Sequence, residues 1–306
     1  MKAIKNILLV LSTGYIFVYF SEHMFWARVR PEDSLNEWLA VWIAYSLAAF
    51  IFLHIITYFK VSNRWALFLA GAVFGWAVEG IIVQTTYESL PLSISWTGLA
   101  WHALITIWIG WFAFRQRLSS PASFGTLKLA IFTGAGYGLW AITWWLEPDG
   151  GVSTLGEFSM FVMTTSILVA MAYWLAHWSA TEPFTPNRWV TRTIYGLFIL
   201  YFLFIAIPAA PIASIILPVL LGLTFFGLHK NKQNELNNSS LINLPGGVHP
   251  FNYISLLALP LTAISVYALA LAYNLQWQIN WIIYLITTSL GFILFFVSFY
   301  KIHRTP

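Results

Sequence analysis

Apolar segments of about twenty residues follow one another along almost the whole chain, and this feature most constrains its fold. A helix of about 20 apolar residues crosses a hydrocarbon layer ~30 Å thick. Of the 306 residues, 59% are hydrophobic and only 8% are charged. Ordinary globular domains carry roughly 25% charged residues, and a water-soluble core could not enclose so much apolar surface. The sequence therefore predicts an all-α, polytopic integral membrane protein.

Polar breaks and breaks rich in Pro or Gly divide the chain into ten candidate transmembrane helices, which we expect to form a single domain of successive antiparallel hairpins. The N-terminal apolar run lacks a small-residue cleavage site, so we interpret it as the first helix and not as a removed signal. The longest break, 229–251, is predicted to be a flexible cytoplasmic loop. The predicted helices cover 4–22, 37–59, 65–86, 96–114, 126–146, 157–178, 190–208, 211–228, 252–273 and 279–300.

The basic residues predict how these helices are oriented across the membrane. If the N-terminus is cytoplasmic, thirteen of the 15 Lys and Arg residues fall on the cytoplasmic side, and only Arg28 and Arg30 fall outside. Short cytoplasmic loops of membrane proteins carry such an excess of positive charge. We therefore expect a multi-pass protein with both termini in the cytoplasm.

Several classes of partner and chemistry are disfavoured by what the sequence lacks. The basic residues are scattered and form no patch, so no nucleic-acid partner is expected. Cysteine is absent, which excludes thiolate metal ligands and a cysteine nucleophile. No nucleotide-binding loop, haem motif or HExxH motif is present, and the cofactor is unknown. The partners that we expect are membrane lipid and a lipophilic small molecule.

Ionisable residues inside the predicted helices are the main candidates for function, because each costs at least ~2.5 to 3.5 kcal/mol to insert into a membrane. Glu79 lies about eight residues before the outer end of its helix, and His102 about six residues into the next one. These depths are roughly 12 Å and 9 Å, so adjacent antiparallel helices would bring the two side chains level. We expect them to form a hydrogen bond. Glu22 lies nearer the same side of the membrane and is predicted to be a second carboxylate of a catalytic site.

Aromatic residues near this depth suggest a pocket. Trp76, Trp101, Trp140 and Trp144 fall within predicted spans, and Tyr19 lies on the same helical face as Glu22. These five residues are predicted to line a pocket for a large apolar ligand. The open alternative is that the tryptophans face lipid.

The acidic and histidine residues also have a purely structural interpretation, in which Glu79 and His102 form a satisfied pair that fixes helix packing. A metal site is a weaker alternative. Glu22, Glu79 and His102 include no pair of Glu or His residues three or four apart on one helix, so no metal is assigned.

A faint internal repeat is present. Residues 71–75 (Gly-Ala-Val-Phe-Gly) recur as 134–138 (Gly-Ala-Gly-Tyr-Gly), with an offset of 63 residues. The third and fourth helices would then superpose on the fifth and sixth, with Ile142 in the place of Glu79 and Thr165 in the place of His102.

Three functions stay open. The leading hypothesis is an intramembrane enzyme that acts on a lipid-soluble substrate, with Glu79 as acid or base, His102 as its partner and Glu22 as a second carboxylate. The second is a proton-coupled transporter of a small or amphipathic solute, and the third is a non-catalytic subunit of a membrane complex. Residues 21–26 (Ser-Glu-His-Met-Phe-Trp) resemble, in Glu22 and two aromatic residues, the Glu-Glu-x-x-Phe-Phe motif of membrane lycopene cyclases. In length and helix number the chain resembles the drug/metabolite transporter superfamily. We assign the chain to neither family.

Overall fold

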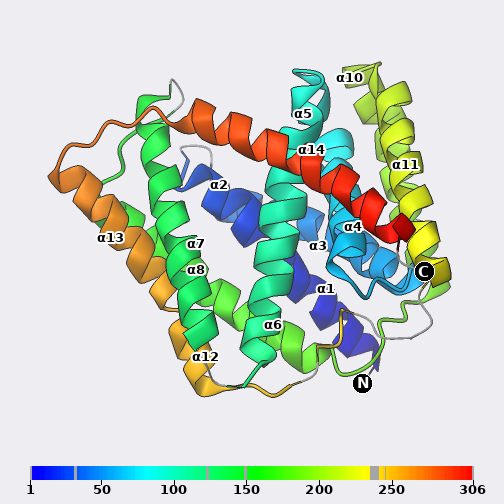
Figure 1. Ribbon diagram of the computed structural model, residues 1–306, viewed down its shortest axis with the longest axis horizontal. Helices are drawn as coiled ribbons and strands as arrows, with labels where there is room; N and C mark the ends of the chain where they lie inside the picture. Colours follow the sequence, from blue (N-terminus) through cyan, green and yellow to red (C-terminus); the bar gives the residue numbers. More distant parts are fainter. Residues whose placement is uncertain are drawn as a thin grey trace.

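The computed structural model describes residues 2–30, 33–121, 124–147, 150–234, 241–244 and 246–304, and these residues form helices and no strands (Figure 1). Several long helices contain a π-helical part, in which the backbone bonds join residues five apart. The elements are α1 (Lys2–Val18), η1 (Tyr19–His23), α2 (Met24–Trp26), α3 (Leu35–Tyr58), α4 (Arg64–Ala77), η2 (Val78–Ile82), η3 (Thr85–Tyr87), α5 (Leu92–Ser95), η4 (Trp96–Ala113), α6 (Phe114–Ser119), α7 (Phe124–Thr143), η5 (Trp144–Leu146), α8 (Leu155–Ser179), α9 (Arg188–Tyr201), η6 (Phe202–Ala206), α10 (Ile207–Ala209), α11 (Ala213–Asn234), α12 (Pro250–Ser255), α13 (Ala258–Ala272) and α14 (Asn280–Arg304).

In the described residues, 10 helices are long and apolar enough to cross a membrane. Each of them overlaps one of the ten ranges expected from the sequence. The chain therefore has the length and composition of a multi-pass membrane protein. These helices are Lys2–Trp26, Leu35–Tyr58, Arg64–Ile82, Leu92–Ser119, Phe124–Leu146, Leu155–Ser179, Arg188–Ala209, Ala213–Gln233, Pro250–Ala272 and Asn280–Arg304.

Polar side chains determine where several of these helices begin. Ser34, Asn63 and Asn187 each accept a hydrogen bond from a backbone N–H in the first turn of the helix that follows. Thr154 and Glu157 form a capping box at the start of α8, in which each side chain accepts from the backbone of the other residue. These caps satisfy backbone donors that a helix leaves unpaired at its N-terminus.

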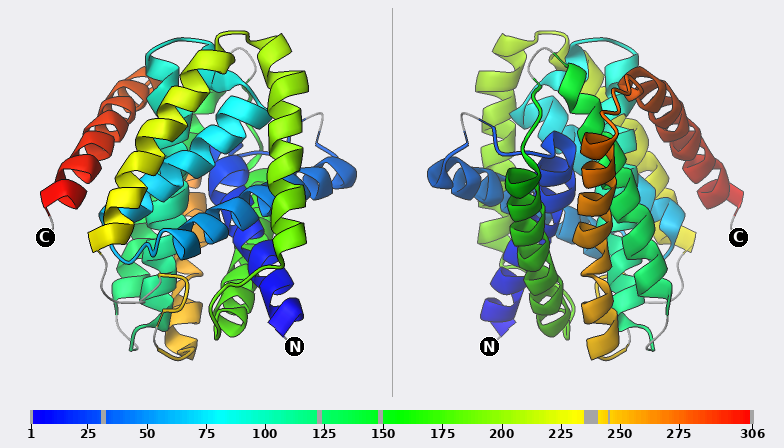
Figure 2. Two further views of the ribbon diagram at one scale, coloured as in Figure 1. Left: turned by 90° about the vertical axis from the view of Figure 1, so that its right-hand side faces the viewer. Right: turned by 90° about the vertical axis from the view of Figure 1, so that its left-hand side faces the viewer.

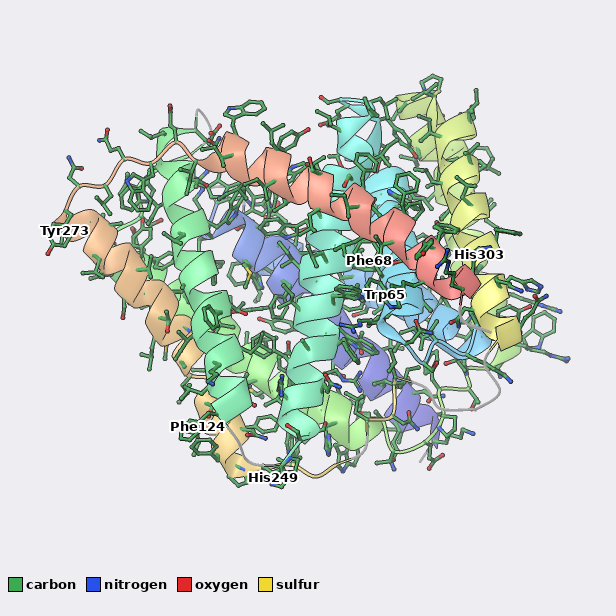
Figure 3. All side chains as sticks on the ribbon, in the orientation of Figure 1. Trp65, Phe68, Phe124, His249, Tyr273 and His303 are labelled. Atoms are coloured by element: carbon green, nitrogen blue, oxygen red, sulfur yellow. The ribbon has the colours of Figure 1, made fainter. Side chains whose placement is uncertain are left out.

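The connections between the ten helices gather at opposite ends of the bundle. In Figure 3, Phe124 and His249 lie at the lower edge of the molecule, whereas Tyr273 lies at the upper left. The chain between η3 and α5 and the segment around α10 also lie at the top in Figure 1, and the N-terminus lies at the bottom.

Helix α4 lies at the centre of the bundle and is buried from Ala66 to Ala77. It packs closely against η4, and their contacts run in opposite order along the two helices: Gly71 lies against Ala103, and Gly75 lies against Gly98. A Cβ atom at Gly75 would collide with the backbone of Gly98, so the absence of side chains is what permits this approach.

The later helices pack in an order that differs from the order of the chain. Helix α7 packs mainly against α13, because Gly134 lies against the backbone of Leu259 and Gly138 against that of Ala263. The glycines of α4 instead face the very next long helix, η4. The two glycine segments therefore contact different kinds of neighbour, and the internal repeat expected from the sequence is wrong. An arrangement of successive hairpins does not describe this half of the bundle. Figure 2 shows α14 at the outer edge of the bundle, where it packs against η4 and α4.

A buried arginine connects the chain after α11 to the bundle. Arg115 is 5% exposed, stacks over Trp111 with 4.3 Å between its guanidinium carbon and the ring, and donates from Nη2 to the carbonyl oxygen of Ile242 at 2.5 Å. Asn252 donates from Nδ2 to the carbonyl oxygen of Ser120 at 2.9 Å. The described part of the predicted 229–251 loop is thus held against the end of α6. Residues 235–240 and 245 lie outside the described chain.

Candidate functional site

The three ionisable residues singled out by the sequence all lie on π-helical segments. Glu22 belongs to η1, Glu79 to η2 and His102 to η4. A π-helical turn interrupts the regular backbone pattern and changes the direction of the side chains that follow, and such turns are frequent at functional sites. Three of them meet here, on three different membrane-length helices.

Glu79 and His102 are in direct contact. The imidazole Nε2 atom of His102 lies 2.6 Å from Oε1 of Glu79, and both residues are buried, at 2% and 8% exposure. The second carboxylate oxygen, Oε2, accepts a hydrogen bond from the hydroxyl of Thr85. The hydrogen bond expected from the sequence is therefore present, and both carboxylate oxygens of Glu79 have a partner.

The geometry of α4 and η4 explains the contact. Side chains on a helix lean toward its N-terminus. Glu79 and His102 lie on opposite sides of the point where Gly75 meets Gly98, and the two helices run in opposite directions. Their side chains therefore lean toward each other. Close backbone approach at the glycine pair leaves a gap that a carboxylate and an imidazole fill.

Two hydroxyl groups extend this pair into a chain. Nδ1 of His102 lies 2.9 Å from Oγ of Ser21, which in turn lies 2.9 Å from Oγ1 of Thr106. When Glu79 is a carboxylate, the imidazole donates from Nε2 and its Nδ1 atom accepts the hydroxyl proton of Ser21. Sequence reasoning missed Ser21 and Thr106. Serine and threonine are ordinary residues in membrane helices, and nothing in their spacing marked these two.

Glu22 forms a second carboxylate group near the first. Its Oε1 atom accepts a hydrogen bond from the hydroxyl of Tyr45 at 2.6 Å, and its Oε2 atom accepts from Nε1 of Trp26 at 3.2 Å. Tyr45 also lies near the histidine, with 6.4 Å between the centres of its ring and that of His102. No hydrogen bond joins Glu22 to Glu79 in the described residues, but both line the same cavity.

That cavity has a volume of about 870 Å³, within the range of ligand pockets. It is bounded by the end of the first helix, by η2, η4 and α7, and by the start of α14. The carboxyl groups of Glu22 and Glu79, with His102 and Ser21, contribute polar atoms to a wall that also holds eight aromatic side chains. Its aromatic lining residues are Phe25, Trp26, Trp96, Trp101, Trp140, Trp144, Trp281 and Tyr284.

Backbone carbonyl groups fix the orientation of this aromatic wall. Trp140 and Trp144, one turn apart on α7 and η5, both donate from Nε1 to the carbonyl oxygen of Phe25, at 2.6 and 2.8 Å. Trp101 donates from Nε1 to the carbonyl oxygen of Phe20 at 2.9 Å. Helix α2 ends at Trp26, so the carbonyl oxygen of Phe25 has no backbone N–H partner from a following helical turn. The two indole N–H groups take the place of that partner.

Two of the residues expected at the pocket lie elsewhere. Tyr19 is fully buried between α1 and α8, where its hydroxyl lies 2.8 Å from Oγ of Ser166. Trp76 is fully buried in the packing between α4 and α14, and donates to the carbonyl oxygen of Ile94 at 3.0 Å. Both serve the helix core, whereas Trp101, Trp140 and Trp144 line the cavity.

The segment between η2 and η4 covers one side of the site. Tyr87 donates from its hydroxyl to the carbonyl oxygen of Gly80 at 2.8 Å, which holds η3 against η2. Partial burial raises the pKa of Tyr87 to about 12, so this donor keeps its proton at all physiological pH values. Thr85, the partner of Glu79, belongs to the same short segment.

The site chemistry is that of an acid–base group. The described residues contain no cluster of three or more His, Cys, Asp or Glu side chains placed to hold a metal ion. A carboxylate and an imidazole 2.6 Å apart can exchange a proton, and a cavity wall gives that proton access to a ligand.

Comparison with known proteins gives no relative. No protein-family model matches the chain, and no curated protein or solved structure shows significant similarity to it. The fold defines a protein with ten helices of membrane-spanning length in its described residues, and these enclose a buried Glu79–His102 contact beside a cavity.

Proposed function

We propose that this chain is an integral membrane enzyme that transfers a proton to or from a lipid-soluble substrate. The observation that carries the proposal is the Glu79–His102 hydrogen bond in the wall of an aromatic cavity. A structural pair would need no neighbouring space of about 870 Å³. General acid–base catalysis needs both a shared proton and room for the reacting atoms.

In this proposal Glu79 exchanges the proton with the substrate, because it faces the cavity and is more exposed than His102. When Glu79 has given up its proton, its carboxylate accepts a hydrogen bond from the Nε2–H group of His102, which stabilises the charge. Ser21 donates to Nδ1 when the imidazole is neutral, and so fixes which nitrogen carries the proton. Glu22 is the second carboxylate, held by Tyr45 and Trp26, and accepts or supplies the proton at the other end of the reaction.

The orientation in the membrane is also part of the proposal. The N- and C-termini lie in the cytoplasm, which places the aromatic cavity in the outer half of the bilayer. The excess of Lys and Arg in the loops on the other side of the predicted helices supports this orientation. The substrate then enters from the hydrocarbon layer, which suits the aromatic lining.

The test is turnover of natural lipids. Wild-type protein and the Glu79→Gln variant are placed in liposomes with a total lipid extract of the cells that make the protein, and the lipids are compared by mass spectrometry over time. We expect the wild type to convert at least one lipid and the variant to convert none. The matched control is Glu182→Gln, an exposed carboxylate that does not line the cavity.

Two results would overturn the proposal that the chain is an enzyme. If wild-type protein leaves the lipid profile unchanged, it does not catalyse a reaction on this class of substrate. Uptake of a solute into the liposomes that needs a pH gradient and Glu79, without chemical conversion, would instead identify a proton-coupled transporter.

A further inference from the structure

We infer that the aromatic cavity selects lipophilic ligands that carry a positively charged group, such as an alkylammonium ion, and rejects ligands with an anionic headgroup. The inference names the ligand class of the site and rests on the proposed function, since it concerns the same cavity. Two independent properties of the described lining support it: the balance of its charges, and the arrangement of its aromatic rings.

The charged groups of the described lining are mostly acidic. One guanidinium, that of Arg30, is present, and it forms an ion pair with Asp33 at 2.9 Å between Nη2 and Oδ1. The lining carboxyl groups are four, those of Glu22, Glu79, Glu88 and Glu147. The pair with Asp33 already offsets the arginine, so a phosphate in the cavity would meet repulsion from the carboxylates.

Aromatic rings, whose π faces are electron-rich, cluster along the same space. Three tryptophans form one part of the wall: Trp96, Trp101 and Trp140. The ring centre of Trp101 lies 6.0 Å from that of Trp96 and 5.2 Å from that of Trp140, and the centres of Trp96 and Trp140 lie 6.1 Å apart. Phe25 lies among them, 4.7 Å from Trp101. A cation is attracted to such a face when it lies within about 6 Å of the ring centre.

The two properties act at one place. Trp26 belongs to the aromatic wall and also donates to Glu22 from Nε1 at 3.2 Å, so a carboxylate and the aromatic cluster are directly connected. Trp101 is adjacent in sequence to His102, the partner of Glu79. A positive group near the wall thus lies close to aromatic faces and carboxylates together, whereas an alkyl chain fills the rest of the cavity.

The experiment uses three photoreactive probes with the same diazirine-bearing alkyl chain and different ends: trimethylammonium, alcohol and phosphate. The full-length protein is embedded in lipid nanodiscs, labelled at equal membrane concentrations of each probe, and digested for mass spectrometry. We expect cavity peptides to be labelled most by the ammonium probe, less by the alcohol and least by the phosphate. Non-photoreactive dodecyltrimethylammonium should compete with the first probe. Equal labelling by the three probes, or strongest labelling by the phosphate, would overturn the inference.

A matched pair of variants separates the π faces from mere apolar surface. Trp96 suits this test because its side chain contacts its neighbours through its ring. Its indole N–H forms no hydrogen bond within the described chain. Trp96→Leu should weaken competition by dodecyltrimethylammonium about 3- to 10-fold, and Trp96→Phe should weaken it less. Trp174→Leu, at an exposed position on α8, is the control. Equal effects of Leu and Phe at position 96 would contradict a role for the aromatic face, and the order of the three probes decides the inference if Trp96→Leu does not fold.

The result can be separated from that of the proposed function. Glu79→Gln should abolish lipid turnover but keep the preference for the ammonium probe, because the aromatic wall and the other carboxylates stay in place. If the protein shows this preference but converts no lipid, the inferred ligand class stands and the proposed enzymatic function is wrong. If it converts lipid but prefers the phosphate probe, the proposed enzymatic function stands and the inferred ligand class is wrong.

Discussion

His102 joins two helices that are far apart in the sequence, because its Nε2 atom lies 2.6 Å from Glu79 while its Nδ1 atom lies 2.9 Å from Ser21. Both ring nitrogens are therefore used, and the tautomer of the imidazole is coupled to the protonation of Glu79. This arrangement permits tests that distinguish a chemical role of the pair from a purely structural one.

Glu79→Gln is expected to keep the protein folded and to abolish turnover. The amide retains the shape of the side chain and can still bond to His102 and Thr85, but it cannot exchange a proton. Size-exclusion behaviour and thermal unfolding in detergent check the fold, and the lipid assay checks turnover. Near-normal turnover in this variant would assign the pair to helix packing alone.

His102→Ala is expected to destabilise the protein by roughly 1 to 3 kcal/mol, because it leaves the buried carboxylate of Glu79 without its main donor. His102→Gln, which can still donate to Glu79, should recover part of that stability while turnover stays low. Unfolding midpoints in one detergent give the comparison. A stability of His102→Ala equal to that of the wild type would show that the contact contributes little to the fold.

Ser21→Ala is expected to lower the turnover number about 10-fold with little change in KM, because Ser21 orients the imidazole of His102 through its Nδ1 atom. Ser21→Thr retains the hydroxyl and should recover activity. Nitrogen NMR of labelled histidine provides a second readout, since loss of the Ser21 donor should mix the two tautomers of His102. An unchanged tautomer in Ser21→Ala would exclude this positioning role.

The membrane orientation can be tested with single cysteines, since the natural chain has none. We expect a cysteine at Arg117 to react with a membrane-impermeant reagent from the cytoplasmic side only, and a cysteine at Glu88 from the opposite side only. Both natural residues are exposed. Labelling of both from one side would rule out this orientation. Asp149, which this orientation also places outside, lies beyond the described residues.

Arg115→Ala is expected to release the chain that follows α11. The substitution removes the donor to the carbonyl oxygens of Leu241 and Ile242 and the stacking over Trp111. Limited proteolysis within 229–251 should become several-fold faster, with a loss of roughly 1 to 3 kcal/mol in stability from the buried carbonyl groups. Arg117→Ala, at an exposed position two residues later, is the control. Equal cleavage rates in the two variants would contradict this attachment.

The sequence was sufficient to place the ten apolar helices and the Glu79–His102 contact. Helix length and hydropathy follow directly from composition, and the depth of a residue follows from its distance to the helix end. The contact also needed two neighbouring helices, and Gly75 with Gly98 provides them with a close approach.

The faces of the helices were harder to predict. Tyr19 and Trp76 were expected at the pocket, but the π-helical turns η1 and η2 begin at or just after them and change the angular positions on which a helical periodicity of 3.6 depends. The repeat failed for a different reason. Glycine pairs at equal spacing permit close approach, but they do not determine which helix approaches.

The carbonyl oxygen of Phe25 accepts hydrogen bonds from two indole groups at once, those of Trp140 and Trp144. The edges of both rings are therefore held by the fold itself, and their conformational entropy is lost on folding. Binding then does not have to order this wall, which favours affinity through preorganisation.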